Sequence, residues 1–181
     1  LQSVEVESGS LWSAPRLSEV IYDDGSLRVD VKALSIDWTL SALADEAHKA
    51  GLKVLTHTVT VERGKVAARA KVDVIAHSLQ DRELDAEAVD LLKANGTVYV
   101  PTLAVYEPVK PGQPEPANRN DPRLQQALRK FGYALHNVKA LHDAGVAIAV
   151  GTDAGMPGTL HGTATLREME LLVQAGLTPA E

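Results

Sequence analysis

From about residue 29 onward, two patterns of apolar and polar residues alternate along the chain. Short apolar runs rich in Val, Ile and Leu alternate with longer segments whose apolar positions recur every three or four residues, as on a helix with one buried face. The short runs are typical of buried strands and lie at Val29–Leu34, Leu52–His57, Val72–His77, Val98–Leu103 and Val146–Thr152. The longer segments predict helices over Thr39–Ala50, Val61–Lys71, Asp85–Asn95, Asp121–Gly145 and Thr165–Ala175.

The predicted helices have recognisable ends. Asp85 and Asp121 are expected N-caps, because a short carboxylate can accept a hydrogen bond from a free N–H of the first turn. Pro122 follows at the first helical position, where its missing N–H costs nothing. Gly51 and Gly145 follow the last turns of two helices, as glycine commonly does. Strand and helix then alternate as in parallel βα units, whose strands are apolar because helices cover both faces of the sheet.

The predicted fold class is therefore α/β, with about five βα units in residues 29–181. Residues 1–28 carry no clear pattern and are expected to form an irregular lead-in. Five units are too few for a closed eight-stranded barrel, which typically needs about 250 residues, so the sheet is either open or part of a larger barrel. The sequence Thr178-Pro179-Ala180-Glu181 is a capping box, which predicts that another helix begins there. We therefore expect the chain to be part of a longer protein.

Composition and charge narrow the functional classes. The 181 residues carry 18 basic and 24 acidic side chains, a net charge of −6, which argues against nucleic acid as a partner because clustered Lys and Arg bind phosphates. No stretch approaches the roughly 18 consecutive apolar residues of a membrane span, and no signal peptide is visible, which favours a cytoplasmic location over export. The absence of Cys excludes disulfides and thiolate ligands. A small-molecule substrate is the expected partner, and exposed strand edges would favour a homo-oligomer.

Three predicted strands end in a side chain that can bind a metal. His57 and His77 close two successive strands, and Asp153 follows the last strand. Parallel strands deliver their carboxyl ends to one edge of the sheet, so these side chains should converge to about 4–5 Å between donor atoms, for metal–ligand bonds near 2 Å. The ligand set suits zinc, and also iron, cobalt or manganese. A single histidine there is more often structural, and an aspartate can simply cap a turn, but three such strand ends together favour a divalent-metal site.

Further positions near this edge carry candidate chemistry. Lys32 lies in an apolar strand, where it either extends from an edge to solvent or is buried with a lowered pKa. In the buried case its neutral amine could bind carbon dioxide, and the carbamate would bridge two metal ions. His161 lies in the glycine-rich loop after Asp153, where it either contacts substrate or packs the loop. The proline-rich loop Tyr106–Asn120 also follows a strand end, so Tyr106 is a candidate substrate contact and the loop is either a lid or a surface connection.

Several short stretches occur in an order that is similar to a known family. They are Glu46-Ala47-His48-Lys49-Ala50-Gly51, Leu55-Thr56-His57, Val72–His77, Pro101-Thr102-Leu103, Gly151-Thr152-Asp153-Ala154-Gly155, His161 with Glu168 and Leu171, and Ala175–Pro179. The set resembles the amidohydrolase superfamily, in the branch of imidazolonepropionase and Xaa-Pro dipeptidase, over about Val29 to Glu181. The resemblance implies a (β/α)8 TIM barrel, of which this chain would hold strands 4–8.

The resemblance also implies an activity and a ligand set. In that family a lysine that can be carboxylated, two histidines and an aspartate bind one or two divalent ions, commonly zinc. The matching positions are Lys32, His57, His77 and Asp153. The implied reaction is hydrolysis of an amide or other C–N bond by metal-activated water, with Asp153 as general base and then general acid.

One departure from the family keeps alternatives open. The His-x-His pair of the family's first strand occurs nowhere in this sequence. The chain is therefore either part of a longer hydrolase or a non-catalytic partial barrel that has lost these metal ligands. A doubly wound binding protein without metal is a third hypothesis, disfavoured because neither G-x-G-x-x-G nor the P-loop pattern is present.

Overall fold

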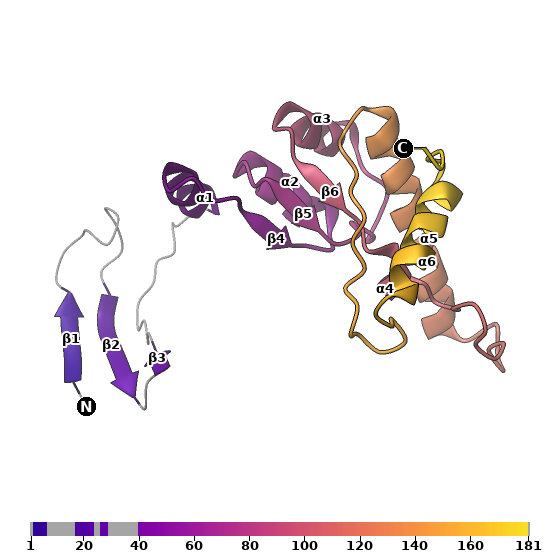
Figure 1. Ribbon diagram of the computed structural model, residues 1–181, viewed down its shortest axis with the longest axis horizontal. Coiled ribbons are helices and arrows are strands. Elements are labelled where there is room, and N and C mark those ends of the chain that lie inside the picture. Colours follow the sequence, from indigo (N-terminus) through magenta and orange to yellow (C-terminus); the bar gives the residue numbers. More distant parts are fainter. Residues whose placement is uncertain (1, 7–16, 24–25, 29–39, 181) are drawn as a thin grey trace. The chain divides into compact units, whose positions relative to one another are not determined.

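The computed structural model describes residues 2–6, 17–23, 26–28 and 40–180. The chain divides into two compact units, residues 1–39 and 40–181 (Figure 1). The pattern of apolar residues predicted a boundary between residues 28 and 29 instead. The predicted strand Val29–Leu34, with its candidate ligand Lys32, lies outside the described residues.

The first unit contains a three-stranded antiparallel sheet where an irregular lead-in was expected. Its strands are β1 (Gln2–Val6), β2 (Leu17–Asp23) and β3 (Ser26–Arg28), in the order β1-β2-β3. Asp23 pairs with Ser26, so β2 and β3 form a tight hairpin. The overlooked signal is the dipeptide Asp24-Gly25 between them, since Asp-Gly between two apolar runs is a strong sequence indicator of a hairpin.

The second unit contains a parallel sheet, as the alternation of strand and helix predicted. Its strands are β4 (Leu55–His57), β5 (Val74–Ala76) and β6 (Val98–Val100), in the order β4-β5-β6. The register aligns His57 with Ala76 and Ala76 with Val100, so the carboxyl ends of the three strands lie at one edge.

The prediction of a strand over Val146–Thr152 is wrong. In this segment only Ile148 pairs with β6, through an isolated parallel bridge to Tyr99. Two backbone hydrogen bonds make the bridge, from the Tyr99 N–H to the Ala147 carbonyl and from the Ala149 N–H to the Tyr99 carbonyl, each 2.9 Å long. In the described residues, the parallel sheet thus consists of β4, β5 and β6, with one segment bridged to β6. The apolar run was recognisable, but its extent of pairing depends on a partner far away in the sequence.

The helices follow the predicted order, with one addition. They are α1 (Leu40–Lys49), α2 (Val61–Arg69), α3 (Ala86–Ala94), α4 (Leu103–Tyr106), α5 (Pro122–Asp143) and α6 (Thr163–Ala175). Both predicted N-caps are confirmed: the Asp85 carboxylate accepts the Ala88 N–H at 2.9 Å, and that of Asp121 accepts the Arg123 N–H at 2.7 Å. The short helix α4, directly after β6, was not expected. None of the helices in the described part of the chain combines the length and apolarity that crossing a bilayer requires.

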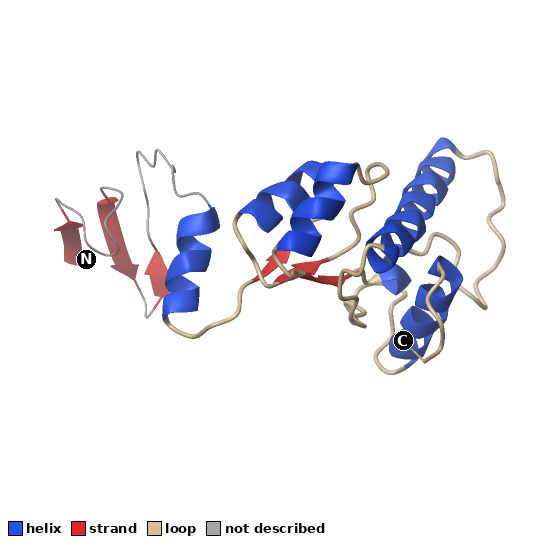
Figure 2. Cartoon of the chain, turned by 90° about the horizontal axis from the view of Figure 1, so that it is seen from above, coloured by secondary structure: helices blue, strands red, loops and turns tan. Residues whose placement is uncertain are grey.

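The core lies between one face of the parallel sheet and the helices that cover it (Figure 2). Ile75 and Tyr99 point into it from β5 and β6 and are fully buried. The other face is more open, as Leu55 shows with 64% of its surface exposed. Gly64 in α2 serves this packing, because a Cβ there would lie only 2.7 Å from a methyl group of Leu79. Glycine therefore allows α2 to approach the segment that follows β5.

Polar contacts position the residues between β5 and α3. The Asn137 amide, fully buried on α5, accepts the Leu84 N–H and donates to the carbonyls of Leu79 and Arg82, with distances of 2.7–2.9 Å. Because the oxygen and the NH₂ group of this buried amide are both hydrogen-bonded to the loop, the contacts fix one loop conformation. The loop therefore leaves the end of β5 in a defined direction.

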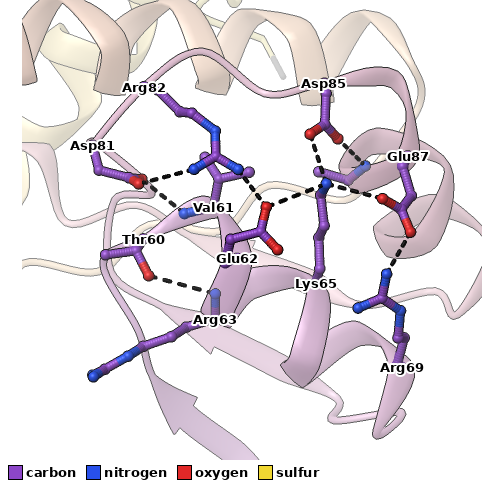
Figure 3. Close-up of polar contacts among 11 residues, drawn as sticks. Thr60, Val61, Glu62, Arg63, Lys65, Arg69, Asp81, Arg82, Asp85 and Glu87 are labelled. Carbon is purple, nitrogen blue, oxygen red and sulfur yellow. Dashed lines mark hydrogen bonds and ion pairs between the residues drawn. The ribbon is translucent and has the colours of Figure 1, made fainter.

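A cluster of ion pairs joins α2 to the start of α3 (Figure 3). Its centre is Lys65, whose side chain is only 7% exposed and whose ammonium lies 2.6 Å from the Asp85 carboxylate and 2.9 Å from that of Glu87. These two carboxylates raise the Lys65 pKa. Glu62 adds a third carboxylate at 3.5 Å. Because the Asp85 carboxylate also caps α3, the cluster ties the start of α3 to the middle of α2.

Candidate active site

Two histidines from neighbouring strands meet at the carboxyl edge of the parallel sheet. His57 is the last residue of β4, and His77 directly follows β5. The centroids of their rings lie 4.6 Å apart, with an interplanar angle of 68°. The parallel ladder between β4 and β5 sets this juxtaposition, because it pairs His57 with Ala76, the neighbour of His77. The sequence-based expectation that these two side chains lie together is thus confirmed.

The His77 ring is held by a hydrogen bond. Its Nδ1 lies 2.8 Å from the hydroxyl oxygen of Thr102. Partial burial lowers the His77 pKa, the neighbouring His57 lowers it further, and the Asp153 carboxylate opposes the shift. The lowered pKa favours the neutral ring near neutral pH, with Nδ1 bonded to Thr102, while Nε2 has no hydrogen-bond partner among the residues that the structure describes.

Thr102 has an unusual backbone for a β-branched residue. It is only 3% exposed, and its φ of 48° lies in the left-handed region, which costs free energy in residues other than glycine. It precedes α4 in the N-cap position, yet its side chain makes no capping hydrogen bond. Its hydroxyl is used by His77 instead.

Asp153 lies in electrostatic reach of this pair without completing a ligand set. Its carboxylate raises the pKa of both His77 and Tyr106, and its own φ of 50° is left-handed. Within the residues that the structure describes, no three His, Asp or Glu side chains are grouped closely enough to hold a metal ion. The predicted three-way convergence is therefore reduced to a pair of histidines with a nearby carboxylate. The physical reason is that Asp153 follows the segment that one bridge alone ties to β6.

Two candidate substrate contacts have different surroundings. Tyr106, the last residue of α4, presents its ring to His77 with centroids 6.1 Å apart and an interplanar angle of 78°. Burial and the Asp153 charge raise its pKa, so the phenol stays protonated. His161 is exposed and lies over Gly155, its Nε2 being 3.5 Å from where a Cβ of that glycine would be. The structure thus places Tyr106 beside the histidine pair and His161 on the loop after Asp153.

A pocket opens beside α4. Its volume is about 390 Å³, and its lining comes from α4, the loop at residues 107–113, the loop at 158–160 and the first turns of α6. Lys110 and Arg167 bring positive charge to it. The Arg167 guanidinium is already paired, with Glu107 through two hydrogen bonds of 3.1 and 2.5 Å and with Glu170 at 2.6 Å. Among the described residues, the Lys110 ammonium donates hydrogen bonds only to neutral oxygens, those of the Ala104 carbonyl and the Thr159 hydroxyl.

Glu168 and Thr102 were not identified as site residues from the sequence. Glu168 lies on the buried face of α6 with Ala164, Leu171 and Leu172, and it is 0% exposed. Its carboxylate accepts the N–H groups of Leu103 and Ala104 at the start of α4. Burial raises its pKa to about 7, against the effect of these hydrogen bonds and of Lys110. The available signal was a charged residue in the apolar stripe of a helix.

Comparison with known proteins gives partial matches. The chain matches no protein-family model. It is 29% identical over 152 residues to uncharacterised proteins of Mycobacterium bovis and Mycobacterium tuberculosis, covering 84% of this chain and 40% of those proteins. The chain thus spans less than half the length of these relatives.

Solved structures of similar fold come from amidohydrolase-family proteins. A candidate prolidase from Bifidobacterium longum is 31% identical, with a TM-score of 0.63, over 78% of this chain and 36% of its own. A Xaa-Pro dipeptidase, solved with methionine in its active site, is 28% identical with a TM-score of 0.58, over 76% of this chain and 32% of its own. An amidohydrolase is 28% identical with a TM-score of 0.59, over 86% of this chain and 36% of its own. These neighbours support a relation to amide-bond hydrolases, over about a third of their length.

Proposed function

We propose that this chain supplies metal-binding and proton-transfer residues of a metal-dependent hydrolase that cleaves an amide or other C–N bond. The observation that carries the proposal is the pair His57 and His77, 4.6 Å apart at the ends of adjacent parallel strands, with Nδ1 of His77 held by Thr102. A histidine whose second nitrogen is fixed by a hydrogen bond is typical of metal sites, because the bond sets the tautomer and the orientation of the ring. The prolidase and dipeptidase neighbours point in the same direction.

The donor set fits a divalent ion of the zinc type. His57 and His77 would hold it through neutral imidazole nitrogens, and Asp153 and Lys32 would be the further ligands. Lys32 would be carboxylated if the site holds two ions. The chemistry that such an ion supplies when bound is Lewis acidity, which activates water and polarises a carbonyl group. The lowered pKa of His77 serves this role, since a protonated imidazole cannot bind a cation.

The remaining residues have roles in proton transfer and binding. Asp153 would take the proton from the attacking water at a carboxylate oxygen and deliver it to the leaving amine nitrogen. Tyr106 stays protonated because its pKa is raised, so its hydroxyl can donate a hydrogen bond to a substrate oxygen beside His77. His161 would contact the substrate from the loop after Asp153.

Removal of metal tests this proposal. In the complete natural protein, a chelator should abolish hydrolysis of Xaa-Pro dipeptides, and Zn²⁺, Mn²⁺ or Co²⁺ should restore it. The measurement is proline release before and after chelation, with metal content determined in parallel. Hydrolysis that survives complete metal removal would contradict the metal-dependent mechanism. A protein that binds metal but hydrolyses no amide or other C–N substrate would favour the non-catalytic alternative.

The pocket beside α4 suggests where the substrate's acidic end would lie. Its Lys110 ammonium is partly buried and bonds to neutral oxygens, and it is held by the Ala104 carbonyl on the helix that ends in Tyr106. A charge-assisted hydrogen bond contributes about 1.5–3 kcal/mol, roughly 10- to 100-fold in binding. We therefore expect Lys110→Met to raise KM for a dipeptide with a free carboxylate by about that factor, with kcat little changed.

Two comparisons make this expectation specific. The amidated form of the same dipeptide should show little difference between wild type and Lys110→Met. Lys130→Met removes the same charge from an exposed position of α5 and should leave both substrates unaffected. If Lys110→Met affects free and amidated dipeptides equally, Lys110 does not bind the carboxylate.

A further inference from the structure

Helix α4 begins without the cap that its own sequence offers. Thr102 lies in the N-cap position, where a threonine hydroxyl commonly accepts an N–H group of the first turn. Here the hydroxyl is 2.8 Å from the His77 Nδ1 and makes no cap. The first N–H groups of α4 therefore need an acceptor from elsewhere, since an unpaired buried N–H costs about 1–3 kcal/mol.

Glu168 provides that acceptor from α6. One carboxylate oxygen accepts the Leu103 N–H at 2.8 Å, and the other accepts the Ala104 N–H at 2.7 Å. Helix α6 lies against α4 in the structure, so the carboxylate reaches the start of α4 directly (Figure 1). The side chain is 0% exposed, and water does not compete for these bonds.

We propose that Glu168 is a positioning residue for His77, which acts by capping α4 in place of Thr102 and so leaves the threonine hydroxyl free to hold the imidazole. The chain of contacts runs from the Glu168 carboxylate through the Leu103 and Ala104 amides to Thr102 and then to His77 Nδ1. Each oxygen of the carboxylate accepts a hydrogen bond from one N–H group. Both oxygens must therefore be acceptors, which favours the ionised form. A glutamine would offer one acceptor and one donor, and the donor would face an N–H group.

The left-handed backbone of Thr102 fits the same role. A φ of 48° at a β-branched residue persists only where its surroundings fix it. The two amides that Glu168 binds follow Thr102 directly, so the carboxylate holds the chain at the point where the strain occurs. Without this anchor, Thr102 can relax, its hydroxyl can turn to cap α4, and Nδ1 of His77 loses its partner.

The first test measures the His77 ring directly. In the metal-free complete protein at about pH 8.5, nitrogen NMR of His77 should show one dominant tautomer in the wild type and a mixture in Glu168→Gln. Thr102→Val should produce the same mixture, because it removes the hydroxyl at the end of the chain of contacts. An unchanged His77 tautomer in Glu168→Gln would overturn the proposal. This readout involves neither metal nor substrate, so it stays informative if the proposed hydrolase function fails.

The second test uses metal affinity and rests on the proposed role of His77 as a ligand. Loss of a hydrogen-bond partner of a metal-binding histidine typically weakens affinity 10- to 100-fold. Glu168→Gln and Thr102→Val should each weaken Zn²⁺ binding by roughly 10-fold or more, and the double variant should be no weaker than Thr102→Val alone. Fully additive losses in the double variant would show two independent effects and overturn the proposal.

Matched variants separate positioning from general loss of stability. Leu171→Ala creates a cavity at a fully buried position of the same helix and should lower the melting temperature without changing the His77 tautomer. Glu168→Asp keeps the charge on a shorter side chain, and we expect an intermediate effect, which can be measured if Glu168→Gln does not fold. The positioning role is contradicted if Leu171→Ala changes the tautomer ratio of His77 as much as Glu168→Gln does. It is also contradicted if Glu168→Asp keeps the wild-type tautomer ratio while Thr102→Val changes it.

Discussion

Replacing Asp153 by asparagine in the complete protein should lower the turnover rate of the proposed hydrolase reaction by at least the 10²- to 10⁴-fold typical of losing a general acid–base group. Asparagine keeps the size of the side chain and one oxygen that can bind a metal, but it cannot take a proton from water. Metal content should therefore fall only modestly while kcat collapses. The measurement is kcat for a dipeptide substrate together with the bound metal per chain.

A purely structural Asp153 predicts a different result. Asparagine tolerates the left-handed backbone that Asp153 adopts, with its φ of 50°, and it occupies turns as readily as aspartate. A structural role would therefore leave both turnover and metal content nearly unchanged, and that outcome would reject Asp153 as the proton carrier. Asp90→Asn makes the same chemical change on the exposed side of α3 and serves as the matched control.

Replacing His57 by alanine should act on the metal first. His57 lies at the end of β4 beside His77, so its loss removes one of the two imidazoles that the structure brings together. Metal affinity should decrease by more than the roughly 10- to 100-fold that is typical when a hydrogen-bond partner of a metal ligand is lost. Activity should be low in stoichiometric metal and recover in part when the metal is in excess, which separates this variant from Asp153→Asn.

A histidine outside the site provides the control for this variant. His136 on α5 is exposed, and its alanine variant should keep the metal affinity of the wild type. If His57→Ala and His136→Ala bind metal equally well, the histidine pair is not the metal site. The pH dependence gives a second check. Because the His77 pKa is lowered, its imidazole stays neutral to a lower pH than usual, and protonation of His77 itself should weaken metal binding only below the ordinary histidine value of about 6.5.

The features that the sequence predicted well are those encoded over a few residues. Asp85 and Asp121 cap their helices because the amides they accept from lie two or three residues away. The histidine pair was also predictable, since successive parallel strands bring His57 and His77 to the same edge once both are recognised as strand ends. Local signals and the pairing rule for parallel strands are sufficient in these cases.

The features that were missed depend on partners far away in the chain. Glu168 binds amides 65 and 64 residues before it, so no local pattern indicates which group its carboxylate caps. The segment at residues 146–152 has the apolar run of a strand, yet it pairs with β6 at a single position. Thr102 follows β6, whereas the His77 ring that its hydroxyl contacts follows the neighbouring strand β5, 25 residues earlier in the chain.

The unequal attachment of the two parts of the site has an evolutionary consequence. His57 and His77 are fixed by a continuous ladder between β4 and β5, whereas Asp153 and the loop after it are joined to β6 through one bridge. Substitutions and insertions in that loop can therefore accumulate without moving the histidines. A lineage built on this arrangement could keep the histidine pair while natural selection explores changes in the loop after Asp153, since the two parts belong to segments with separate mechanical support.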